Sequence, residues 1–170
     1  MSHQDILNVE LADPSQPLPS MRPSWPRFAV IRINGQPLCG YLSLLPLVAF
    51  ADLDVDYPLA TCDCGEPGCS DVFDDLSQEV HPDFVSWLPG PTTAAALHLA
   101  ERRYVFDRRA FQAEIARLRA YLFEHCQHPE LGPAIEELTF SMADQDEARK
   151  LTPAELENHI TDLRQDALRP

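Results

Sequence analysis

The sequence predicts an α+β fold, in which an antiparallel sheet of about five to six strands packs against C-terminal helices. Short segments rich in β-branched and aromatic residues, separated by turn signals, occupy the chain as far as Phe106. Helical periodicity follows them. The chain has 170 residues, of which 45% are hydrophobic and 24% charged. This length and composition are sufficient for one domain with a sizeable core.

Composition divides the chain into three parts. Residues 1–26 contain repeated prolines from Pro14 onward, which are incompatible with a helix or an inner strand. We therefore expect an extended N-terminal arm, in which residues 6–11 form a short strand or lie along the core. Residues 27–142 form the single α+β domain, and residues 143–170 form an amphipathic helix packed on it.

The first part of the domain reads as a hairpin. Residues 28–33 (F-A-V-I-R-I) form a strand because of their β-branched content. Asn34-Gly35 is a strong signal for a two-residue turn, after which residues 36–42 return antiparallel. Residues 44–53 are apolar and fit either a short helix or a buried strand.

Alternating acidic residues follow at Asp52, Asp54 and Asp56. The spacing resembles the start of a calcium loop, but that loop requires Gly where Tyr57 stands. A solvated acidic strand or loop is the preferred interpretation.

Two further strands are predicted at residues 84–88 and 102–106. Val85 and Trp87 share one face of the first, and we expect Trp87 in the core. Residues 92–100 fit a short helix or a loop.

The last third of the chain is predicted to be helical. Asp107 is placed to N-cap the longest helix, and its apolar stripe is Phe111, Ile115, Leu118, Leu122 and Cys126. A second helix is predicted from Pro133. The final helix begins at a capping box, Thr152 to Glu155, with proline at its first position.

Three of the five cysteines lie in one segment, residues 61–70 (T-C-D-C-G-E-P-G-C-S). Pro67-Gly68 predicts a type II turn, and the flanking residues predict a β-hairpin. Cys62 and Cys64 share a face of one strand, and Cys69 falls opposite. The three sulfur atoms are therefore expected to converge.

Such a cluster can bind a soft metal such as zinc, cycle between dithiol and disulfide, or pack as small hydrophobic groups. The acidic neighbours Asp63, Glu66 and Asp71 disfavour a thiolate and favour a bound cation, so metal ranks above redox chemistry. Cys62, Cys64 and Cys69 are the predicted zinc ligands. Candidates for the fourth ligand are Cys39, His81, His98, Cys126 and His128.

These motifs resemble a group of uncharacterised bacterial proteins. The shared features are the C-x-C-G-x-x-G-C hairpin, a V-x-W strand ending at Trp87, and an F-D-R helix start at Phe106-Asp107-Arg108. The resemblance covers residues 57–122. It implies a fold unit and no particular reaction.

Charge narrows the classes of partner. The net charge is −14, from 27 acidic and 13 basic residues, which disfavours nucleic-acid binding and is compatible with a basic protein partner, with a bound cation or with solubility alone. The start of the chain lacks a signal-peptide pattern, and no apolar run is long enough to span a bilayer. We therefore expect a cytoplasmic protein without membrane contact, with a homodimer as one possible assembly.

No nucleophile elbow, phosphate-binding loop or H-E-x-x-H motif is found, so an enzyme is not the preferred interpretation. The preferred function is a protein-binding or regulatory module whose cysteine hairpin holds structural zinc. The alternatives are a zinc-dependent enzyme or a thiol redox sensor that uses the same cysteines.

Overall fold

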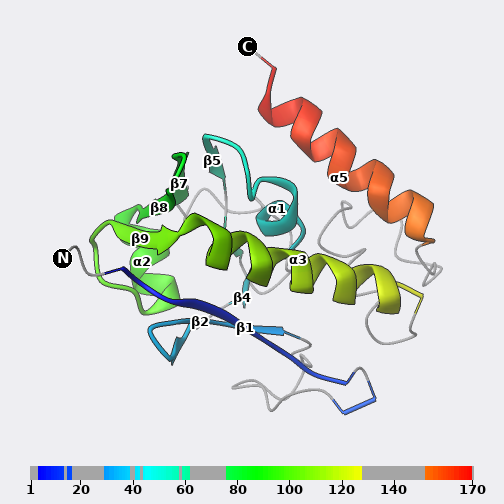
Figure 1. The fold of residues 1–170 in the computed structure, drawn as a ribbon, viewed down its shortest axis with the longest axis horizontal. Coiled ribbons are helices and arrows are strands. Elements are labelled where there is room, and N and C mark those ends of the chain that lie inside the picture. Colours follow the sequence, from blue (N-terminus) through cyan, green and yellow to red (C-terminus); the bar gives the residue numbers. More distant parts are fainter. Residues whose placement is uncertain are drawn as a thin grey trace.

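A computed structural model describes residues 4–13, 15–16, 29–38, 41–42, 44–57, 59–61, 76–127 and 152–169. Within these ranges the predicted α+β class is confirmed: antiparallel sheets of three and four strands pack with helices, including the C-terminal one (Figure 1). The strands thus lie in separate sheets. A third, two-stranded sheet is also present among the described residues. The predicted cysteine hairpin, the helix from Pro133 and most of the proline-rich arm lie outside the described residues.

The three-stranded sheet contains the predicted hairpin. Its strands are β1 (Leu7–Leu11), β2 (Ala29–Ile33) and β3 (Gln36–Pro37). Asn34 and Gly35 both adopt positive φ, 53° and 80°, as a two-residue turn with the twist of a hairpin requires. The N-terminal strand pairs with β2 along its whole length, so this part of the predicted arm belongs to the fold.

The four-stranded sheet has the order β5-β7-β8-β9. Its strands are β5 (Val55–Tyr57), β7 (Leu76–Val80), β8 (Phe84–Pro89) and β9 (Tyr104–Asp107). The predicted burial of Trp87 is confirmed, because its ring packs edge-on against Phe106 and Phe111 in the core. The two-stranded pair consists of β4 (Tyr41–Leu42) and β6 (Ala60–Thr61).

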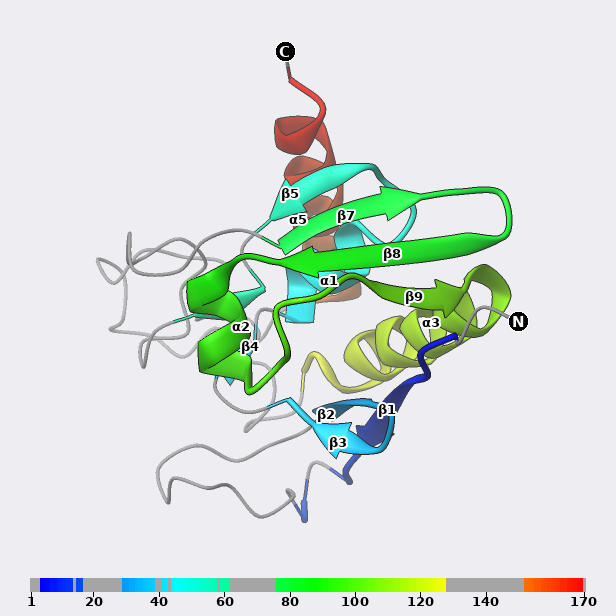
Figure 2. The same ribbon diagram turned by 90° about the vertical axis from the view of Figure 1, so that its left-hand side faces the viewer.

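Helices lie on one side of the four-stranded sheet (Figure 2). They are α1 (Leu44–Ala49), α3 (Arg108–His125) and α5 (Pro153–Ala167). The apolar segment at residues 44–53, whose sequence fits either a helix or a strand, thus begins with a short helix. A short helix, α2 (Pro91–Leu97), follows β8. No helix in the described part of the chain has the length and apolar character needed to cross a membrane.

Local signals explain how the two long helices begin. Asp107 caps α3 by accepting a hydrogen bond from the Ala110 amide at 2.9 Å, and all five residues of its predicted stripe are buried. Thr152 and Glu155 form the predicted capping box of α5. Along α5, Leu156 and Ile160 are buried, Leu163 is half-buried and Ala167 is exposed, so the buried face of this helix is narrow.

Candidate functional site

The three predicted zinc ligands, Cys62, Cys64 and Cys69, lie outside the described residues, but the strands on either side of them are described. Thr61, the residue before Cys62, ends β6 and pairs with Tyr41 of β4. After the segment, Leu76 begins β7 and pairs with Tyr57. Paired strands therefore end at Thr61 and begin again at Leu76, on either side of residues 62–75.

Three of the five candidates for the fourth ligand are described, and they belong to different parts of the fold. Cys126 is buried at the end of α3, where its thiol donates to the Phe123 carbonyl at 3.4 Å and burial raises its pKa. Because a metal ligand must be a thiolate, this environment does not favour Cys126 as a ligand. His81 lies near the far end of β7, about 17 Å along the strand from Leu76.

His98 is the described candidate whose helix, α2, contacts β6, the strand that leads into the cysteine segment. It caps α2 with a left-handed backbone, φ 57°. The imidazole is exposed. Among the described residues no group of three or more Cys, His, Asp or Glu side chains is arranged to hold a metal.

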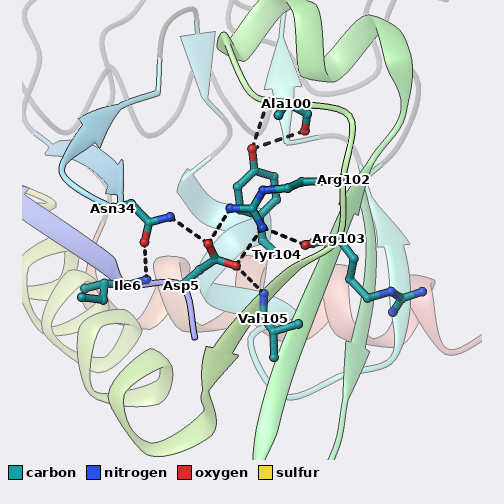
Figure 3. A network of polar contacts seen from close by, with 8 residues as sticks. All are labelled: Asp5, Ile6, Asn34, Ala100, Arg102, Arg103, Tyr104 and Val105. Atoms are coloured by element: carbon teal, nitrogen blue, oxygen red, sulfur yellow. Dashed lines mark hydrogen bonds and ion pairs between the residues drawn. The ribbon is translucent and has the colours of Figure 1, made fainter. Parts of the chain in front are cut away.

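A buried carboxylate, Asp5, forms the centre of the best-connected polar network among the described residues (Figure 3). Arg102 donates to both of its oxygens, at 2.6 and 3.1 Å. The Asn34 side chain donates at 2.7 Å and the Val105 amide at 2.9 Å. The Arg102 guanidinium also lies 4.0 Å from the centre of the Tyr104 ring.

The network ties the two main sheets together. The Asp5 amide donates to the Val105 carbonyl at 2.7 Å, forming a parallel bridge to β9. Asn34 also binds Ile6 twice: its side-chain oxygen accepts from the Ile6 amide, and its own amide donates to the Ile6 carbonyl. The amide and carbonyl of Val105 are thereby both occupied by Asp5.

Asp5 is an anion at neutral pH. Burial alone would raise its pKa, but hydrogen bonds from Arg102, Asn34 and Val105 lower it to about 2. A carboxylate held by four donors is a poor general base, since its lone pairs are already engaged. The arrangement therefore serves to join parts of the fold.

A second polar cluster lies on the outer face of the four-stranded sheet. Arg103 pairs with Glu79 and donates to the Ser86 hydroxyl at 2.8 Å, while Nε2 of His81 lies 3.5 Å from Oε2 of Glu79. The pKa of Glu79 is lowered, first by Arg103 and then by His81. The Ser86 hydroxyl donates to the Glu79 carboxylate at 3.4 Å, but the Arg103 ion pair lowers the pKa of Glu79 and makes it a weak base for activating the serine.

A third network is buried around Gln78. Its amide nitrogen donates to the carbonyls of Phe50 and Leu53, at 2.6 and 2.8 Å. Its oxygen accepts from the Trp87 indole at 2.9 Å and from the Tyr57 hydroxyl at 3.5 Å. Gln78 thus links the end of α1 to three strands.

Sequence reasoning missed these three networks. The acidic segment expected to be solvated is also more engaged than predicted, because Asp52 pairs with Arg164 and Asp54 accepts from the Val80 amide. One signal was available for Gln78: a polar residue at an inward position between Leu76 and Val80 on an alternating strand.

Comparison of the chain with family models, curated proteins and solved structures gave no match.

Proposed function

We propose that this protein is an acidic protein-binding or regulatory module whose partner presents a basic surface, and that Cys62, Cys64 and Cys69 hold a structural zinc ion. The observation that carries the first part is how the chain uses its arginines. The second part follows from the cysteine pattern and from the paired strands on either side of it.

Most arginines in the described ranges are already paired with carboxylates. The pairs are Arg32–Glu10, Arg102–Asp5, Arg103–Glu79, Arg117–Glu114, Arg119–Glu157, Arg164–Asp52 and Arg169–Asp166. Because acidic residues outnumber basic ones by 27 to 13, this pairing leaves a surplus of negative charge. Exposed acidic residues include Asp54, Asp56, Asp83, Glu101, Glu124 and Asp162.

Such a surface favours encounter with a basic protein and discourages acidic partners and nucleic acid. The arginines would offer positive charge to a partner only if their ion pairs with carboxylates were broken. We therefore expect the charge of the surface to persist when a partner docks, and electrostatics to govern the rate of association.

The partner proposal is tested with a defined basic probe, a fluorescent arginine-rich peptide, beside a matched peptide in which glutamine replaces arginine. Affinity for the basic probe should fall at least about tenfold when NaCl is raised from about 0.05 to about 0.5 M, because salt screens exposed charges. Affinity that does not depend on salt, or equal binding of both peptides, would contradict the proposal.

Zinc is supported by the paired strands on either side of the cysteine segment and by its acidic neighbours. Strands β6 and β7 fix where the segment leaves and rejoins the fold, and a thiolate-bound ion would staple the chain between them. His98, on the helix that contacts β6, is the preferred fourth ligand among the described candidates.

Elemental analysis of the reduced, zinc-replete chain tests this part. We expect about one zinc per chain, lost in Cys64→Ser and retained in Cys126→Ala, whose thiol is already bonded inside α3. His98→Asn should lower the zinc content if His98 completes the site. Absence of zinc from the unchanged chain, or a zinc content that is the same in Cys64→Ser as in the unchanged chain, would refute the zinc proposal.

A further inference from the structure

Helix α5 carries its own N-terminal capping signals. The Glu155 amide donates to the Thr152 hydroxyl at 3.2 Å, and the Thr152 amide donates back to the Glu155 carboxylate at 2.8 Å. Pro153 occupies the first turn, where its missing N–H costs nothing. The two capping hydrogen bonds at the start of the helix are thus made between residues of the helix terminus itself.

The surface on which α5 rests is small and chemically specific; we call it the α5 seat, formed by α1, Asp52 and Arg119. Leu156 and Ile160 are buried against the apolar core that contains α1. Arg164 pairs with Asp52 at 2.6 Å and donates to the Ala49 carbonyl at the end of α1, at 2.7 Å. On the other side, Glu157 pairs with Arg119 of α3.

These contacts define what the α5 seat recognises. It takes a helix with two apolar residues four positions apart, followed four positions later by an arginine that meets both a carboxylate and an orphan helix carbonyl. The C-terminal end of α5 projects beyond the rest of the fold in both views (Figures 1 and 2). The seat therefore holds the helix mainly through one face and two ion pairs.

The chain between the seat and its helix is long. Residues 128–151 separate the described end of α3 from Thr152, and a fully extended chain of that length spans at most about 80 Å, at about 3.3 Å per residue. We propose that the α5 seat is an exchangeable helix-binding surface, which the α5 of a second copy of this chain can fill in place of its own. Exchange would reproduce every contact of α5, which makes it a low-cost route to a dimer.

The Arg164–Asp52 pair allows a specific test with two full-length variants. In Asp52→Arg and in Arg164→Glu, each alone, the ion pair becomes a contact between like charges. In a mixture, the unchanged Arg164 of the first variant can meet Asp52 of the second. The glutamate introduced in the second can meet the arginine introduced in the first, so both pairs are restored only when the helices are exchanged.

Native mass spectrometry of an equimolar mixture, with one variant labelled with ¹⁵N, should therefore show a mixed dimer as the main species. Each variant alone should show at most about a tenth as much dimer. The chain with both substitutions restores the pair within one molecule, and we expect it to regain the melting temperature lost in the single variants. A mixture that remains monomeric while this doubly substituted chain recovers would overturn the proposal.

A second measurement covers the case in which the charge variants fail to fold. A fluorescent peptide of residues 152–169 should bind full-length Ile160→Asp, whose own helix is unseated, about tenfold more tightly than it binds the unchanged chain, whose seat is filled. Equal affinity for the two chains, or no binding to either, would overturn the proposal.

Discussion

At the scale of single residues, Asp5 has the widest reach. Its carboxylate accepts from a hairpin turn, from an edge strand and from Arg102, which lies 97 positions away in the sequence. Its side chain is 5% exposed, whereas that of Arg102 is 47% exposed. Most of the desolvation on forming this ion pair therefore falls on Asp5, and its donors must compensate for it.

Replacing Asp5 with alanine should lower the free energy of unfolding by about 2–4 kcal/mol. The substitution leaves the Val105 amide and the Asn34 side chain without their acceptor, although Arg102 can turn partly to water. Urea unfolding, followed by the fluorescence of Trp87 and the second tryptophan, measures the change.

The matched control is Glu10→Ala, which breaks the more exposed Arg32–Glu10 pair between β1 and β2. We expect it to cost less than about 1 kcal/mol. Equal losses for the two variants would show that the Asp5 network has no special weight.

At the scale of elements, Gln78 shows how one side chain can fasten several of them. It donates to two carbonyls just after α1, those of Phe50 and Leu53, and accepts from the polar atoms of two buried aromatic side chains. All four hydrogen-bonding positions of its amide are used. The joint between α1 and the four-stranded sheet is therefore polar inside an apolar core.

Gln78→Leu keeps the volume similar but removes a hydrogen bond from each of these four groups, of which the Phe50 carbonyl keeps the Leu53 amide, so we expect a loss of about 2–4 kcal/mol. Ser77→Ala, at the neighbouring outward-facing position, should change stability by less than about 0.5 kcal/mol. Thermal unfolding of both variants gives the comparison, and a neutral result for Gln78→Leu would mean that the joint relaxes or admits water.

Elements with local signals could be predicted from the sequence. The Asn34-Gly35 turn, the Asp107 cap and the Thr152 capping box each depend on residues within a few positions, and each is confirmed. The polar joints could not be predicted, because Asp5, Gln78 and Arg164 find partners 97, 28 and 112 positions away. Nothing in the pattern of one segment selects a partner in another.

The division into separate sheets has a similar origin. The residues at 28–33 and 84–88 predict strands, but not which strands will be neighbours. Tyr41–Leu42 pairs with β6 and not with the preceding hairpin, a choice made by tertiary packing. The predicted zinc ligands remain a prediction.

At the scale of the whole molecule, the carboxylates set the response to acid. The pKa of Asp5 is lowered to about 2, and those of Asp52 and Glu79 are lowered by Arg164 and Arg103. A depressed pKa means that the unfolded chain takes up the proton first. The stability contributed by such a group is therefore present above its unfolded pKa and is lost as the pH falls toward its folded pKa.

For Asp5 this loss should occur between about pH 4 and about pH 2, and should amount to about 2 kcal/mol. Comparing the unchanged chain with Asp5→Asn separates the contribution of Asp5 from that of the other carboxylates. The difference in unfolding free energy between the two should be constant above about pH 5 and shrink below about pH 4. A difference that stays constant down to about pH 2 would contradict the assigned pKa.

The bridge from Asp5 to β9 also has a consequence for synthesis on the ribosome. Residue 5 leaves the exit tunnel long before Arg102 and Val105 have been translated, and at about 5–20 residues per second the wait is roughly 5–20 seconds. During that interval β1 can pair with β2, which emerges much earlier, but the two main sheets have no means of joining through Asp5. The nascent chain can therefore form the β1–β2 pair, with Asp5 held by Asn34 alone, and lacks the Arg102 and Val105 donors until its middle third has been made.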